Sequence, residues 1–132
     1  MIPILLKSLA LAAAAMVVNV AAAFGWVAIY SLAIAPGQSE AAYQAYAEQV
    51  APWCSVIAGI PILFAAGWLR ARWGDRGAAG WSMGMWVGVV YVLLDLTILL
   101  SVVGPAALTG VVGLSIITKI AASAWGGRVA RP

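Results

Sequence analysis

Four long apolar stretches follow one another along the chain, and each is long enough to cross a membrane. They cover about residues 8–35, 52–69, 79–102 and 106–125. A membrane-spanning helix needs about 20 predominantly apolar residues, and only short segments separate the four stretches. The pattern therefore predicts an all-α integral membrane protein, a single domain over residues 1–132 with four transmembrane helices in two hairpins.

The segment between the first two stretches has a different pattern. Pro36 and Gly37 end the first helix, and Ser39 is suited to cap a new one. In residues 38–50 the apolar residues recur at helical spacing and share one face, which predicts a short amphipathic helix in the first outer loop. Two interpretations remain open, a helix lying on the membrane surface and a short solvated cap on the loop.

The first stretch also has features of a secretory signal peptide, because Lys7 precedes a run of leucine and alanine. Apolar sequence continues without a break as far as Leu32, which favours a membrane span. In the second span, Pro52 is expected at the helix start and Pro61 near the middle, where it predicts a kink.

Composition supports lipid as the main solvent. Of the 132 residues, 65% are hydrophobic and 8% are charged, whereas a soluble domain has about 25% charged residues. The lipid bilayer is therefore the first partner that we expect.

The basic residues lie on one side of this topology. They are Lys7, Arg70, Arg72, Arg76, Arg128 and Arg131. Glu40 and Glu48 fall on the opposite side. Because cytoplasmic segments retain Lys and Arg, we predict a bacterial inner-membrane protein with both termini in the cytoplasm.

The residue types used in most cofactor sites are scarce. The chain has no histidine and a single cysteine, Cys54, so the commonest metal and haem ligands are missing. Cys54 is expected to pack as a small apolar side chain. No nucleotide-binding, protease or kinase motif is present, and the basic residues do not form a dense patch for nucleic acid. We expect no enzyme activity, no metal, no other cofactor and no nucleic-acid partner.

Three glycines form a pattern in the third span. Gly80, Gly84 and Gly88 recur every fourth residue and share one helix face, so another helix backbone can approach closely. At 100° per residue, Tyr91 and Asp95 fall within the same arc of roughly 80°. This face predicts helix packing and turns the Asp95 carboxylate toward protein.

Asp95 is the only acid within a predicted span. A carboxylate at a helix centre costs about 2.5–3.5 kcal/mol, so Asp95 should be neutral, paired or next to water. Besides Tyr91, the candidate hydrogen-bond donors at matching depth include Asn19, Ser55 and Thr109. Two interpretations are open, structural hydrogen bonding between helices and a site for a proton, a cation or a polar substrate.

Lys119 is the obvious counter-ion by charge. If Gly126 and Gly127 end the fourth helix, counting from the inner helix ends places Lys119 and Asp95 roughly 13–15 Å apart along the membrane normal. We therefore expect Lys119 to extend toward the cytoplasmic headgroups and not to pair directly with Asp95.

Arg70, Arg72 and Arg76 cluster at the inner end of the second span. Such a cluster can hold an anionic lipid headgroup, although a topology signal explains it equally well.

The leading functional hypothesis is a non-enzymatic membrane protein that acts by association, as a homo-oligomer or as an accessory subunit of a larger complex. It rests on the glycine face and on the lack of catalytic groups. The alternative is a small transporter or channel in which Asp95 binds a proton, a cation or a substrate.

Overall fold

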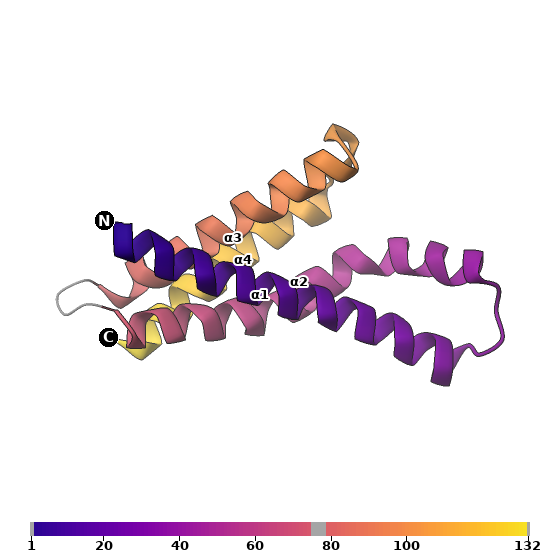
Figure 1. The fold of residues 1–132 in the computed structure, drawn as a ribbon, viewed down its shortest axis with the longest axis horizontal. Coiled ribbons are helices and arrows are strands. Elements are labelled where there is room, and N and C mark those ends of the chain that lie inside the picture. Colours follow the sequence, from indigo (N-terminus) through magenta and orange to yellow (C-terminus); the bar gives the residue numbers. More distant parts are fainter. Residues whose placement is uncertain (1, 75–78, 132) are drawn as a thin grey trace.

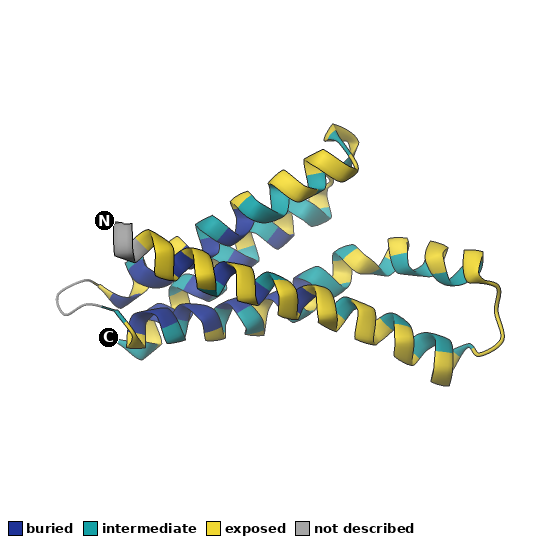
Figure 2. Cartoon of the chain, viewed as in Figure 1, coloured by how far each residue is buried: buried dark blue, intermediate teal, exposed yellow. Residues whose placement is uncertain are grey.

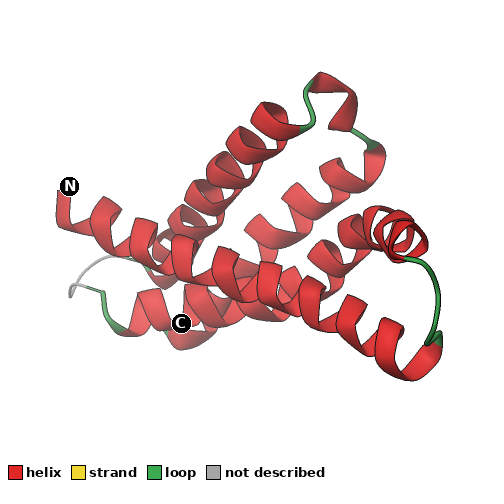
Figure 3. Cartoon of the chain, turned by 45° about the vertical axis from the view of Figure 1, so that its right-hand side comes forward, coloured by secondary structure: helices red, strands yellow, loops and turns green. Residues whose placement is uncertain are grey.

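The computed structural model describes residues 2–74 and 79–131. Its helices are α1 (Ile2–Ile29), continued by the π-helix η1 (Tyr30–Ile34), then α2 (Glu40–Arg72), α3 (Gly80–Val102), the short 3-10 helix η2 (Pro105–Ala107) and α4 (Gly110–Ala130). The described residues contain no strand (Figure 3). Four helical segments are long and apolar enough to cross a membrane. The predictions of an all-α fold and of four helices with the length and composition of membrane spans are confirmed.

The chain runs back and forth along the long axis of the molecule (Figure 1). Consecutive long helices point in opposite directions, and both termini lie at the same end. Near the termini all four helices lie together, whereas α3 and α4 diverge from α1 and α2 toward the other end. The bundle is therefore closed at the terminal end and forked at the far end.

Small residues bring α4 into backbone contact with both α2 and α3. A Cβ atom added to Gly84 would meet the Ser123 carbonyl, and one added to Gly126 would meet the Phe64 carbonyl. The Ser123 hydroxyl also donates a hydrogen bond of 2.7 Å to the Gly84 carbonyl. Without side chains to keep them apart, the helices pack at close range, as glycine-rich faces do in membranes.

The apolar core fills the closed half of the bundle. It consists of Ala12, Ala15, Leu63, Ala66, Val87, Tyr91 and Val92. Figure 2 shows the buried residues gathered in this half and the exposed residues along the diverging ends. Large apolar side chains on the outside, such as Leu32 at 79% exposed, suit a surface whose solvent is lipid.

The expected short amphipathic helix is not a separate element. Ser39 does cap a helix, since its hydroxyl accepts a bond of 3.3 Å from the Ala42 N–H, but that helix continues to Arg72. Pro52 and Pro61 both lie inside it. A proline removes one backbone hydrogen bond, which a membrane helix tolerates when neighbouring groups compensate. Pro52 therefore lies within the helix and not at its start, where the sequence placed it.

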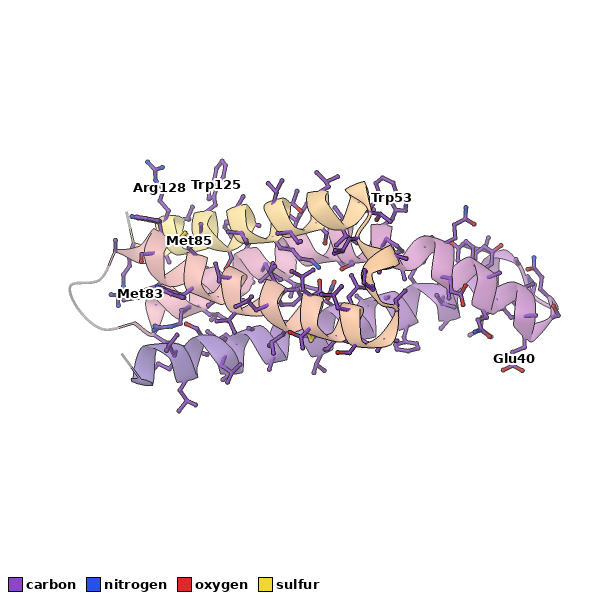
Figure 4. The ribbon with its side chains drawn as sticks, turned by 90° about the horizontal axis from the view of Figure 1, so that it is seen from above. Glu40, Trp53, Met83, Met85, Trp125 and Arg128 are labelled. Atoms are coloured by element: carbon purple, nitrogen blue, oxygen red, sulfur yellow. The ribbon has the colours of Figure 1, made fainter. Side chains whose placement is uncertain are left out.

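The far end of α1 and α2 extends beyond the rest of the bundle. The spans are 30 residues for Leu5–Ile34 and 33 for α2, against 23 for α3 and 21 for α4. The α2 span is ten residues longer than α3, which corresponds to about 15 Å. In Figure 4, Glu40 lies at the tip of this extension, far from Arg128 at the opposite end.

Aromatic side chains hold this extension together. The Tyr30 and Tyr46 rings stack with centroids 3.6 Å apart, and the Trp26 indole donates to the Tyr46 hydroxyl over 3.0 Å. The Tyr43 hydroxyl donates to the Ala35 carbonyl over 2.8 Å, at the end of the π-helix.

Candidate functional site

Side chains from all four helices meet in one polar cluster, which we define as Asn19, Ser55, Tyr91, Asp95 and Lys119. The Lys119 ammonium donates to Ser55 Oγ over 2.8 Å and to Asp95 Oδ2 over 3.1 Å. It also lies 4.8 Å from the centre of the Tyr91 ring. Asn19 Nδ2 donates to the Tyr91 hydroxyl over 2.8 Å and to Ser55 Oγ over 3.2 Å.

The two charges of the cluster differ in their surroundings. The Lys119 side chain is 0% exposed, whereas the Asp95 side chain is 43% exposed. Gly59 on α2 makes room for the lysine, because a Cβ atom there would lie 2.8 Å from Lys119 Cε. Lys119 is thus enclosed by protein, and Asp95 is the charge that remains accessible.

The ion pair corrects the expectation that Lys119 extends to the headgroups. The helix α4 does not end at Gly126 and Gly127 but continues to Ala130, and both glycines lie within it, packed against neighbouring backbones. The helix ends used for the depth count were therefore misplaced.

The register between α3 and α4 shows how the pair forms. Gly84 lies opposite Ser123, Asp95 follows Gly84 by eleven residues, and Lys119 precedes Ser123 by four. Their backbones are therefore seven residues, or about 10 Å, apart along the axis. Side chains lean toward the N-terminus of their own helix, and these two helices are antiparallel, so the two side chains lean toward each other.

Asn19 connects the cluster to α1, and its side-chain oxygen Oδ1 has no hydrogen-bond partner among the described residues. The residue is 6% exposed. An unsatisfied buried polar atom costs about 1–3 kcal/mol, which is unusual enough to require an explanation.

A half-open cavity of about 380 Å³ borders the polar cluster. Residues of α1, α2 and α3 line it. Asn19, Ser55, Tyr91 and Asp95 contribute the polar part of the wall, and the rest is apolar. Lys119 is not among the lining residues.

Four of the five residues predicted for an intramembrane site thus come together, and Thr109 does not. Thr109 is exposed and precedes the first turn of α4, ten residues or about 15 Å of helix away from Lys119. Cys54 is a free, half-buried cysteine. Among the described residues, no hydrogen bond joins it to the polar cluster.

The glycine face of α3 is occupied within the chain. Added Cβ atoms on Gly80, Gly84 and Gly88 would all meet α4. The predicted packing face is present, but its partner is α4, so these glycines do not provide a surface for a second protein.

Arg70 and Arg72, the two described members of the arginine group, do not share one surface. Arg70 is 0% exposed and its Nε donates to Ser8 Oγ over 3.2 Å, so its guanidinium does not face lipid headgroups. Arg72 is exposed and lies 4.7 Å above the Trp68 ring. Arg76 falls outside the described residues.

Sequence reasoning missed Lys119 and Gly59 as members of the site. Lys119 is the only basic residue within the apolar part of any span, and Asp95 is the only acid. That complementarity, together with the leaning of side chains on antiparallel helices, was the signal that could have paired them.

Over residues 2–74 and 79–131, no group of three or more His, Cys, Asp or Glu residues is placed to hold a metal ion. Comparison of the chain with protein-family models, with curated proteins and with solved structures finds no match.

Proposed function

We propose that this chain is a small multi-pass protein of the bacterial inner membrane that binds a small solute in the intramembrane cavity and carries it across the bilayer. One observation supports this above all others. The Asp95 carboxylate is paired with the fully buried Lys119 and still opens into a cavity of about 380 Å³. Intramembrane ionisable residues that face a cavity are characteristic of substrate and ion pathways.

The energetics favour a binding role for the cluster. A buried ion pair seldom adds stability over apolar side chains of the same size, because both charges lose their hydration. Hydrogen bonds between membrane helices contribute only about 0.6–2 kcal/mol. The charges are better accounted for by a ligand that uses them.

Charge distribution supports the proposed orientation, with both termini in the cytoplasm and two helical hairpins crossing the membrane. Lys7 donates to the Trp73 carbonyl over 3.5 Å, and Arg131 donates to the Gly74 carbonyl over 2.9 Å. Both cations thus lie at the end of the bundle that carries the termini, where Arg128 also points outward (Figure 4). Positive charge concentrates on the cytoplasmic side of membrane proteins.

A two-stage experiment tests the solute-binding function. Purified full-length protein is screened for thermal stabilisation by alkali-metal ions, small carboxylates, alcohols and amines, because a ligand that binds the folded state raises its stability. Each stabilising solute is then tested for flux in proteoliposomes. We expect at least one solute to be transported by the wild type, with transport lost in Asp95→Asn.

The matched control is Thr109→Ala, which changes an exposed residue outside the cluster and should leave flux intact. A screen without any stabilising solute, or flux that is equal in Asp95→Asn and wild type, would refute the proposal.

Association with other copies or with a larger complex remains a second proposal. It no longer rests on the glycine face. Its support is the extension of α1 and α2, where Leu32 and Ile34 are 79% and 57% exposed on a span of about 45 Å, longer than the hydrocarbon core of about 30 Å. Native mass spectrometry from mild detergent tests it, and a strictly monomeric protein without a co-purifying subunit would exclude it.

A further inference from the structure

The polar wall of the cavity contains hydrogen-bond acceptors. Asp95 Oδ2 accepts a hydrogen bond from Lys119. An ionised carboxylate has about four lone-pair sites, and the Asp95 side chain is 43% exposed. Asn19, which also lines the cavity, is 6% exposed and its Oδ1 has no partner among the described residues. The Asp95 carboxylate is therefore able to accept further hydrogen bonds from a molecule in the cavity, whereas Asn19 Oδ1 is enclosed by protein.

The charge that faces the cavity is negative. Lys119 is 0% exposed and does not line the cavity, whereas Asp95 does. An anionic solute would meet the carboxylate before it reached the ammonium. A cationic donor would instead gain a charge-assisted hydrogen bond, which is about twice as strong as a neutral one.

The remainder of the wall selects an apolar body. It includes Phe24 and Val27 from α1, Val50 from α2 and Ile98 from α3. The volume of about 380 Å³ is near the lower end of the range of roughly 300–1,000 Å³ for ligand sites. A solute with one aromatic ring or a short alkyl chain suits this space.

Building on the proposed function, we infer that the cavity takes a small solute with a protonated amine on an apolar body. Its N–H groups donate to the Asp95 carboxylate. Lys119 then shares Asp95 with the ligand and keeps its bond of 2.8 Å to Ser55 Oγ and its contact of 4.8 Å with the Tyr91 ring.

Isothermal titration of the full-length protein in nanodiscs tests this substrate class with four probes of similar shape. They are 4-phenylbutylammonium, its N,N,N-trimethyl derivative, 4-phenylbutanol and 4-phenylbutanoate, and empty nanodiscs correct for partition into lipid. A charge-assisted hydrogen bond contributes about 1.5–3 kcal/mol, so we expect the primary ammonium to bind about 10- to 100-fold more tightly than the alcohol. The trimethyl derivative keeps the charge but has no N–H group to donate to Asp95, and should bind about 2- to 10-fold more weakly than the primary ammonium.

The variants test whether the Asp95 carboxylate binds the ammonium group. Asp95→Asn should remove both the preference for ammonium over alcohol and the preference for the primary over the trimethyl ammonium, and Thr109→Ala should change neither. If a variant does not fold, the order of the four probe affinities for the wild-type protein still tests the substrate class.

Two results would overturn the amine class while leaving solute binding intact. One is 4-phenylbutanoate binding as tightly as the primary ammonium. The other is no binding of any of the four probes by a protein that a different solute stabilises. If no solute of any class binds, the proposed function itself fails.

Discussion

Removing Asp95 should destabilise the protein more than removing Lys119, although each substitution breaks the same ion pair. In Asp95→Leu the Lys119 ammonium, which is 0% exposed, loses its counter-ion and keeps only Ser55 Oγ and the Tyr91 ring as partners. In Lys119→Met the apolar stem is retained, and the Asp95 carboxylate, 43% exposed, is left beside a cavity.

The magnitudes follow from this asymmetry. Leaving an uncompensated charge buried costs about 3–5 kcal/mol. The loss of hydrogen bonds between membrane helices, without a stranded charge, costs about 0.6–2 kcal/mol. We therefore expect Asp95→Leu to lower the free energy of unfolding by about 2 kcal/mol more than Lys119→Met, roughly a 30-fold difference in the folding equilibrium constant. The double variant contains neither charge and should resemble Lys119→Met.

Reversible unfolding in mixed micelles of increasing SDS content measures these differences, with the seven tryptophans as the fluorescent probe. The reasoning is refuted if Asp95→Leu is no less stable than Lys119→Met. It is also refuted if the double variant is as unstable as Asp95→Leu, because the cost would then not come from the stranded ammonium.

Two further predictions concern packing and the helical extension. Gly84→Ala should lower stability by about 1–3 kcal/mol, because its Cβ would meet the Ser123 carbonyl. Gly113→Ala should raise stability by about 0.5–1 kcal/mol, because a Cβ atom there has nothing within 4 Å. Equal effects of the two substitutions in the same SDS titration would contradict the assigned contact between α3 and α4. Tyr43→Phe removes the hydroxyl that bonds to the Ala35 carbonyl and to the Gln38 N–H, which should lower stability by about 1 kcal/mol. Amide hydrogen exchange should become faster over residues 35–43 alone. Unchanged exchange in this segment would show that the hydroxyl does not hold the turn.

The apolar pattern was sufficient to predict four helices of membrane-spanning length, because in lipid the backbone must satisfy its own hydrogen bonds. It was not sufficient to place their ends. Pro52 was expected to start a helix and Gly126 to stop one, yet both lie inside helices. Their local preferences yield to packing and to the requirement for continuous backbone bonding, neither of which is visible in a single segment.

The polar cluster could be predicted in part. Matching residues by depth selected Asn19 and Ser55 as partners for Asp95, and the structure brings them together through hydrogen bonds to Tyr91 and Lys119. Depth counting alone missed Lys119, since it ignores the length and direction of side chains. The cavity could not be predicted, because it depends on the angle at which α3 diverges from α1 and α2.

The position of the polar cluster argues against a purely structural role. Between the cluster and the chain termini, Gly84 and Gly88 already hold α3 against α4 at backbone distance, and apolar side chains fill the core. Beyond the cluster, the hydroxyls of Thr97 and Ser101 bond only to carbonyls of their own helix. The charges therefore lie where close packing stops and the cavity begins. Apolar side chains at this position would join the helices at least as well, so the accessible carboxylate favours the proposed binding role over a purely structural one.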